Sequence, residues 1–149
     1  MKYYGKPIEL VPQMQKLISN NQGFWVAVTG KSMVPTLNHL KDRVFISPID
    51  RKVKKGDILL TVTEGRKGKH CLLHRVIKCK GDMLYYRGDG KINREGPLPA
   101  RDVIGIVTQI ERNGKIVLAN NFYYKLWHAF WRKIILLKHY IMVVFSKLK

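Results

Sequence analysis

The pattern of hydrophobic and polar positions divides the chain into a short helical start, a long β-rich stretch and a helical end. Apolar residues in "IELVPQMQKLIS" recur at helical spacing and stop at the Asn-Asn-Gln-Gly loop of residues 20–23, which predicts one helix. From there to about residue 118, short runs rich in β-branched and aromatic residues alternate with Gly, Asp, Asn and Lys turns. These runs are FWVAVT, RVFISPI, DILLTVT, KHCLLHRVIKC, MLYYRG, DVIGIVTQI and KIVLA.

The fold class follows from what separates these runs. No helical pattern lies between them, so we expect a mainly β protein with a coiled antiparallel or barrel-like sheet. "RNGK" at 112–115 predicts a hairpin, because Asn-Gly suits a type I′ turn. We therefore expect an N-terminal helical segment at 1–23, a β-rich core at 24–118 and a C-terminal helix at 119–149.

The last segment, "FYYKLWHAFWRKIILLKHYIMVVFSKLK", is dense in apolar residues but interrupted by basic ones. These interruptions disfavour a spanning helix, which needs about 20 mostly apolar residues in a row. On a helical wheel one side holds Lys125, His128, Arg132, Lys133, His139 and Lys147. The other side holds Leu126, Phe130, Ile134, Leu137, Ile141 and Phe145, with Lys138 as an exception. With Trp127 and Trp131, this pattern favours a basic amphipathic helix in a membrane interface, and leaves open packing on the domain's own sheet or on a partner.

The net charge of the chain indicates which kinds of partner it attracts. Lys and Arg number 28 against 10 acidic residues, a formal net charge of +18, which attracts nucleic acid or anionic lipid without choosing between them. The N-terminal residues contain no long apolar run, so we expect neither a signal peptide nor an N-terminal anchor.

The cysteines and histidines predict no cross-link and no metal site. Cys71 and Cys79 fall in one predicted strand, about 26 Å apart at about 3.3 Å per residue, which is too far for a disulfide. Free thiols agree with a reducing compartment. His70 and His74 share a strand face, but zinc needs three or four convergent ligands and no paired spacing supplies them. We expect no metal and no cofactor.

The stretch "VTGKSMVPTL" offers a candidate nucleophile, Ser32. A serine needs a base within hydrogen-bond reach and donors aimed at the oxyanion that forms. Gly30 allows a tight turn and a close approach of substrate, Pro35 fixes the backbone after the serine, and Met33 offers an adaptable apolar surface. Taken alone, the same residues also describe an ordinary turn.

Five segments in order give the stretch its context: "GKSMVPTL", "VKKGDILL", "LHRVI", "YRGDGKINRE" and "DVIGIV". Between about residues 24 and 110 they resemble the boxes of the signal peptidase I superfamily (S24/S26 type), which includes the LexA-type self-cleaving repressors. The resemblance implies a serine peptidase fold with Ser32 as the nucleophile and "LHRVI" as the box of the general base.

The base box implies the subtype. Bacterial and LexA-type members use a lysine, whereas His74 here resembles the archaeal and endoplasmic-reticulum signal peptidases. A lysine must be strongly desolvated to lose its proton near neutrality, while the unperturbed pKa of histidine is already about 6.5. A histidine base needs a third group to orient it. By the resemblance Asp89 is the first candidate for that group and Glu95 the reserve, and Gly30 leaves oxyanion binding to backbone donors.

The resemblance implies a serine endopeptidase that cleaves leader or signal segments of exported peptides or proteins. An extended substrate would pair beside a strand, with small side chains near the cut. With the C-terminal helix and no N-terminal anchor, we expect a cytoplasmic protein, peripheral on the inner membrane surface, with an exporter or peptide-maturation protein as a further partner. One alternative is a LexA-like regulator that binds nucleic acid, which the short 1–23 segment and His74 disfavour. Another is an inactive relative that only binds peptides.

Overall fold

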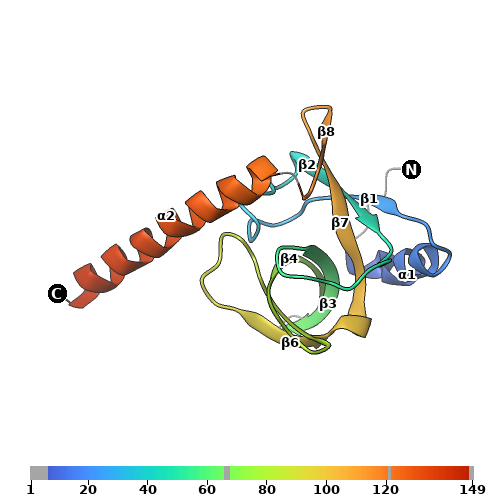
Figure 1. Cartoon of the computed structure of the whole chain (residues 1–149), viewed down its shortest axis with the longest axis horizontal. Helices are drawn as coiled ribbons and strands as arrows, with labels where there is room; N and C mark the ends of the chain where they lie inside the picture. Colours follow the sequence, from blue (N-terminus) through green and yellow to red (C-terminus); the bar gives the residue numbers. More distant parts are fainter. Residues whose placement is uncertain (1–6, 66–67, 121, 148–149) are drawn as a thin grey trace.

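The computed structural model describes residues 7–65, 68–120 and 122–147 (Figure 1). Its helices are η1 (Pro7–Leu10), α1 (Val11–Ser19), η2 (Ala100–Asp102) and α2 (Phe122–Lys147). Its strands are β1 (Phe24–Ala27), β2 (Asp42–Ser47), β3 (Ile58–Gly65), β4 (Gly68–Lys80), β5 (Met83–Arg87), β6 (Glu95–Pro99), β7 (Val103–Arg112) and β8 (Lys115–Leu118). The predicted mainly β fold, with a short N-terminal helix and a C-terminal helix, is confirmed.

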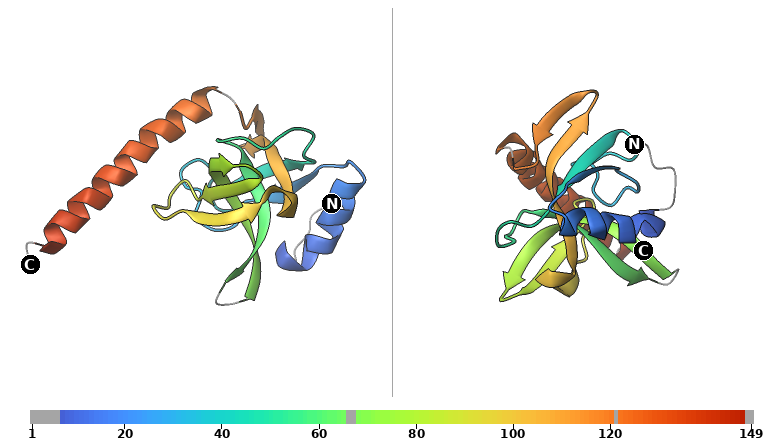
Figure 2. Two further views of the ribbon diagram at one scale, coloured as in Figure 1. Left: turned by 60° about the horizontal axis from the view of Figure 1, so that its bottom comes forward. Right: turned by 90° about the vertical axis from the view of Figure 1, so that its right-hand side faces the viewer.

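The strands form one antiparallel sheet in the order β1-β2-β7-β3-β4-β5-β6, with β8 paired to β7. The sheet coils strongly around β3 and β4 instead of lying flat (Figures 1 and 2). Register shifts in the β2–β7, β3–β7, β4–β5 and β5–β6 pairings bend the strands and assist this coiling.

Both faces of the central strands are buried, which explains their almost continuous apolar sequences. Leu59 and Leu60 are adjacent on β3 and point to opposite faces, so they enter two different apolar clusters. The first cluster includes Val44, Ile46 and Ile110, and α1 adds Met14 to it. The second lies toward β5 and β6. The core thus holds the middle of β3 and β4 from both sides.

One hairpin was predicted from the sequence pattern, and one strand was not. Asn113 and Gly114 have φ values of 51° and 74°, as a type I′ turn requires, so the predicted β7–β8 hairpin is confirmed. Strand β6 was not predicted, because its sequence "EGPLP" contains the residues that usually exclude strands. It lies at the end of the sheet order beside β5, an edge position where proline is tolerated.

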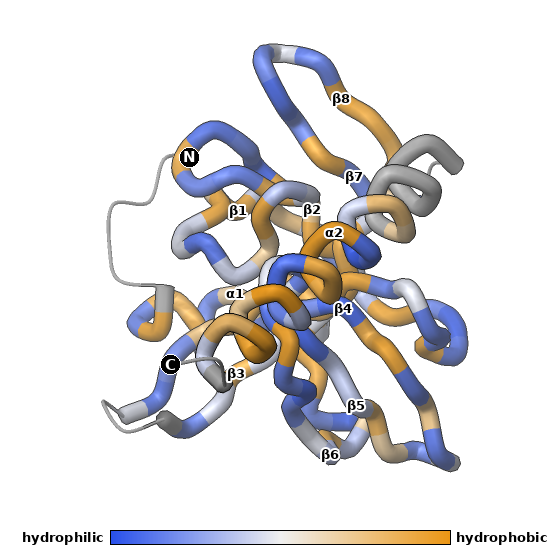
Figure 3. Tube along the Cα trace, turned by 90° about the vertical axis from the view of Figure 1, so that its left-hand side faces the viewer, coloured by the Kyte–Doolittle hydropathy of each residue, from blue (hydrophilic) through white to orange (hydrophobic). Residues whose placement is uncertain are grey.

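Helix α2 extends away from the sheet along most of its length (Figures 1 and 2). Most of its apolar residues from 130 to 145 are exposed, with Phe130 56 %, Leu137 59 % and Phe145 66 % accessible. Figure 3 looks toward the end of α2 and shows apolar and polar positions around its axis. Within the described residues, no helix has the length and hydropathy to cross a membrane. The side chain of Trp127 lies outside the described residues.

Candidate functional site

Ser32 lies in the loop that follows β1 and leads to β2. Gly30 enters this loop with φ +88°, a conformation that favours glycine. Met33 is buried in the first apolar cluster, and the N–H of Leu37 donates to its carbonyl oxygen at 3.0 Å. The residue after the serine is therefore anchored in the core while Ser32 itself stays half-buried. The loop is therefore tied to the core directly after Ser32.

A second loop, residues 88–94 between β5 and β6, packs against the serine. The N–H of Gly90 donates to the carbonyl oxygen of Ser32 at 2.8 Å. A Cβ atom at Gly88 would lie 2.5 Å from that oxygen and 3.0 Å from Nε2 of His74. No side chain fits there, so the glycine allows Ser32 and His74 to approach the same point. The carbonyl oxygen of Ser32 and Nε2 of His74 are therefore separated by no more than the sum of these two distances.

His74 lies on β4 opposite Leu59 of β3 and is only 3 % exposed. Its Nδ1 is 3.1 Å from Oε2 of Glu95, at the start of β6. Its Nε2 is buried, and no hydrogen-bond partner for it occurs among the described residues. A carboxylate on Nδ1 favours the tautomer in which Nδ1 carries the proton and Nε2 presents a lone pair. That lone pair lies on the Gly88 side, where Ser32 is also found.

Burial sets the protonation of this imidazole. Desolvation lowers the pKa of His74 below its ordinary value of 6.5, and the carboxylate of Glu95 opposes part of that shift. The more distant Asp89 also raises this pKa, while Lys91 lowers it. His74 is therefore neutral at neutral pH, the form in which a histidine can accept a proton.

Asp89, which the sequence favoured as the group that orients His74, is held by a different residue. Its carboxylate accepts bonds from Nε of Arg75 at 2.9 Å and Nη2 at 2.7 Å, and both side chains are buried. Nη1 of Arg75 also donates to the carbonyl oxygen of Gly56 at 2.8 Å. Asp89 thus anchors the loop that touches Ser32, and Glu95, the reserve candidate, occupies Nδ1 of His74.

Other contacts that shape the site carried no recognisable signal in the sequence. Nδ1 of His39 accepts the N–H of Gly30 at 2.9 Å, so this N–H is already engaged rather than available to an oxyanion. The N–H of Asp89 donates to Sδ of Met33 at 3.4 Å. The ring of Tyr86 lies 6.1 Å from that of His74, centre to centre, and helps to bury it. Sequence spacing gives no warning of these contacts, because each joins residues from separate segments.

A small pocket lies between the edges of β1, which precedes the Ser32 loop, and β4, which carries His74. β1 pairs with β2 on one side only, and within the described residues its other edge carries no strand. The first half of β4 pairs with β3, whereas β5 pairs with β4 only from Arg75 onward. A pocket of about 30 Å³ lies between these edges, lined by Met14, Val26, Ala27, Thr29, Leu60, Cys71, Leu72 and Leu73. Cys71 and Cys79 are both free thiols.

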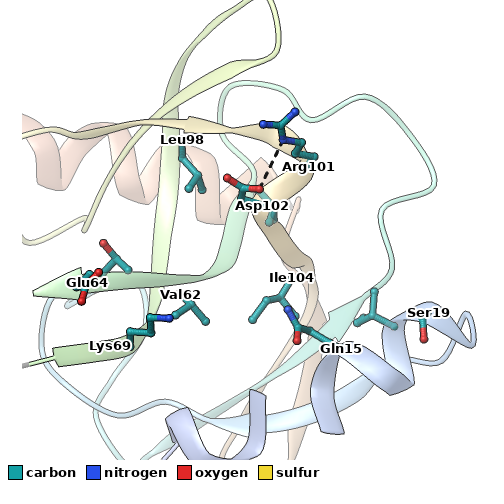
Figure 4. Close-up of a pocket in the computed structure, with 12 residues that line it drawn as sticks. Gln15, Ser19, Val62, Glu64, Lys69, Leu98, Arg101, Asp102 and Ile104 are labelled. Carbon is teal, nitrogen blue, oxygen red and sulfur yellow. Dashed lines mark ion pairs between the residues drawn. The ribbon is translucent and has the colours of Figure 1, made fainter. Parts of the chain in front are cut away.

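A larger hollow lies elsewhere, between α1, β3 and the start of β7 (Figure 4). Its volume is about 590 Å³, and its lining includes Val62, Leu98 and Ile104. The exposed ion pair of Arg101 with Asp102, at 3.8 Å, lies at its rim. Neither Ser32 nor His74 lines it, so it is separate from the candidate site.

Comparison with known proteins gives one family. A search of curated proteins finds no significant match to the chain. The family model described as "Peptidase S24-like" matches residues 3–89, more than half of the chain, and that range contains Ser32, His74 and Asp89. The antiparallel sheet and the site loop after β1 agree with such a peptidase fold. The chain belongs to the S24-like peptidase family.

Proposed function

We propose that this protein is a serine endopeptidase in which Ser32 is the nucleophile and His74 the general base. His74 takes the Ser32 proton through Nε2 as Oγ attacks a peptide carbonyl, and then returns a proton to the leaving amine. The acyl-enzyme is hydrolysed when His74 activates water in the same way. Glu95 keeps the proton on Nδ1 and stabilises the imidazolium, while Asp89 with Arg75 holds the loop against Ser32.

The orphaned Nε2 of His74 is the observation that carries this proposal. A buried nitrogen without a partner costs free energy, about 1–3 kcal/mol for a typical polar group. It is retained here beside a serine, with its opposite nitrogen fixed by a carboxylate. A histidine with only a packing function would gain stability from a partner on Nε2. The histidine-base subtype is our inference from this geometry together with the "LHRVI" box.

The open edges of β1 and of the first half of β4 support an extended peptide as the substrate. A peptide between the open edges of β1 and β4 can form main-chain hydrogen bonds with both, and these bonds make few demands on sequence. The 30 Å³ pocket accepts only a methyl-sized side chain, because a single water occupies about that volume in the liquid. We therefore infer cleavage near small residues, as in the leader or signal segments of exported peptides and proteins.

The orienting role of Glu95 predicts a pH effect. In Glu95→Gln the charge that raises the His74 pKa is lost, so this pKa falls further. His74 acts as a base only above its pKa, so the acid limb of kcat/KM should move to lower pH. The plateau should fall about 10- to 100-fold, because the imidazolium loses its carboxylate. A pH–rate profile on a peptide that the wild-type protein cuts measures both changes.

Glu111→Gln is the matched control, since Glu111 pairs with Arg43 on the surface, on a different strand. It makes the same charge change and should leave the acid limb where it is. If the acid limb of kcat/KM is unchanged in Glu95→Gln as well, Glu95 does not orient His74, and Asp89 becomes the candidate for that role.

We also propose that the protein works at an anionic membrane surface, through α2. The helix carries five Lys or Arg residues and no acidic residue, and most of its apolar residues from 130 to 145 are exposed. Each basic residue near an anionic bilayer contributes about 1 kcal/mol to binding. This location would bring the peptidase to precursors that are being exported, and an exporter or peptide-maturation protein is the partner that this location suggests.

Deleting residues 122–149 should release the protein from anionic vesicles. The truncated protein loses both the exposed apolar residues and the basic ones of α2, so flotation with vesicles should drop to background. Flotation of the intact protein should weaken as salt rises. A truncated protein that still floats would assign membrane binding to the β domain, and salt-sensitive binding of duplex nucleic acid without vesicle binding would favour a LexA-like regulator.

A further inference from the structure

Helix α2 reaches the site loop through Arg132. Nη1 of Arg132 donates to the carbonyl oxygen of Lys91 at 3.1 Å. Nη1 of Arg87, at the end of β5, reaches the next carbonyl oxygen, that of Ile92, at 3.4 Å. Burial lowers the pKa of Arg87, and the charge of Arg132 lowers it further. Successive carbonyls of the loop are therefore held from a strand on one side and from α2 on the other.

The segment held in this way joins the two halves of the candidate site. Gly88 and Gly90 at its start contact Ser32, and Glu95 directly after it contacts His74. Lys91 lies between them, and its N–H donates to the carbonyl oxygen of Gly88 at 2.9 Å. Lys91 is thus linked along this loop to the contacts of Ser32 on one side and of His74 on the other.

Arg132 and the apolar side of α2 point in opposite directions. At about 100° per residue, Arg132 lies about 160–200° around the helix from Phe130 and Ile134. The side of α2 that contacts the loop carries Arg132 together with the apolar Leu136 and Val143. The side that holds Phe130 and Ile134 lies opposite this contact. Exposed fractions of 37 % for Ile134, 45 % for Ile141 and 66 % for Phe145 show that the domain leaves this side uncovered.

Charge decides which partner suits the apolar side. The helix has no acidic residue, and Lys133, Lys138 and Lys147 flank or interrupt the apolar positions. Two copies packed through these sides would bring like charges together, whereas an anionic bilayer accepts both the apolar side chains and the lysines. A helix that projects from its domain is also marginally stable in water, and insertion into a bilayer interface stabilises it.

We propose that an anionic bilayer is the partner of α2 and that Arg132, as a positioning residue, transmits lipid binding to the active-site loop. Lipid binding stabilises α2, which fixes Arg132 on the Lys91 carbonyl and holds residues 88–95 in the arrangement that pairs Glu95 with His74. The inference rests on the proposed peptidase for its effect on rate. Lipid binding should raise kcat more than it lowers KM, because the loop positions the base rather than the peptide.

The experiment compares phosphatidylglycerol with phosphatidylcholine vesicles, using the full chain. We expect phosphatidylglycerol to increase kcat at least about fivefold, the lower end of typical coupling between sites, and phosphatidylcholine to have little effect. It should also slow amide hydrogen exchange in residues 88–95. Arg132→Ala and Arg132→Gln should still float with the vesicles but lose both effects, and Arg132→Lys should retain part of them.

Lys138→Ala is the matched control, because it removes one charge from the exposed part of the same helix. It should weaken flotation slightly and keep the stimulation and the protection. The inference is overturned if Arg132→Ala is stimulated as strongly as the wild type, or if the vesicles leave exchange in 88–95 unchanged. It is also overturned if α2 drives dimerisation in solution and does not bind vesicles. Hydrogen exchange needs no substrate. A protein that cuts no peptide would therefore contradict the proposed function, while its exchange in residues 88–95 would still test this inference.

Discussion

Ser32→Ala should lower kcat/KM for peptide cleavage by about 10³-fold or more, while the protein remains folded. Removing the nucleophile of a serine peptidase leaves only the residual rate that comes from substrate binding and oxyanion stabilisation. The substitution should cost little stability, because Ser32 is only half-buried and its carbonyl oxygen keeps the bond from Gly90. Mass spectrometry of a peptide library rich in alanine, incubated with each protein, measures the loss, and urea denaturation checks the fold.

Ser47→Ala supplies the control. The Ser47 hydroxyl is half-buried and bonded to that of Thr108 at 2.7 Å, on β2 and β7, away from the site. Its loss should lower the free energy of unfolding by about 1 kcal/mol and leave cleavage unchanged. A Ser32→Ala protein that cuts the same peptides at the wild-type rate would end the peptidase proposal.

Among the substitutions considered, Asp89→Asn should lower the free energy of unfolding most, by about 3–5 kcal/mol. Asp89 is 2 % exposed and Arg75 7 %, so the substitution leaves the Arg75 guanidinium buried without its carboxylate. The loop that contacts Ser32 loses its anchor at the same time. Urea denaturation gives the change in the free energy of unfolding, and cleavage of the folded fraction gives the effect on the site.

The double variant Arg75→Met with Asp89→Leu tests the cause, since replacing both members of a buried ion pair often restores stability. Glu111→Gln breaks an exposed pair and should cost less than about 1 kcal/mol. If Asp89→Asn is no more costly than Glu111→Gln, the buried pair is not what holds the loop.

The sequence predicted most of the fold because each strand carries its own local signal. Runs such as "DILLTVT" and "DVIGIVTQI" are apolar on both faces, and the sheet buries them on both faces. Strand β6 escaped prediction because pairing with β5 outweighs the poor strand propensity of Gly96 and Pro97. Strand β6 therefore forms because of its pairing with β5, a tertiary contact that no local sequence pattern indicates.

The candidate site was predictable in part for a similar reason. The surroundings of Ser32 and His74 are local in sequence, so the motifs single out both residues as candidates, and the fold brings their segments together at Gly88. The choice between Asp89 and Glu95 depends on which acid meets Arg75, a contact between β4 and the loop after β5. "HRVI" contains that arginine, but the spacing does not show that it captures Asp89 and leaves Glu95 to His74. The contact of Arg132 with Lys91 joins residues far apart in sequence and left no trace in the pattern.

The most direct test of the central claim is to find which atom becomes acylated. An activated ester of an N-acyl alanine should release about one equivalent of its leaving group in a rapid burst. Trypsin cleaves after Lys31, and the added acyl mass should appear on the peptide of residues 32–41, whose one serine is Ser32. Hydroxylamine should remove it, as expected for an ester, and neither Ser32→Ala nor His74→Ala should acquire it. Acylation of another segment, or labelling of Ser32 that is equally fast without His74, would contradict the account.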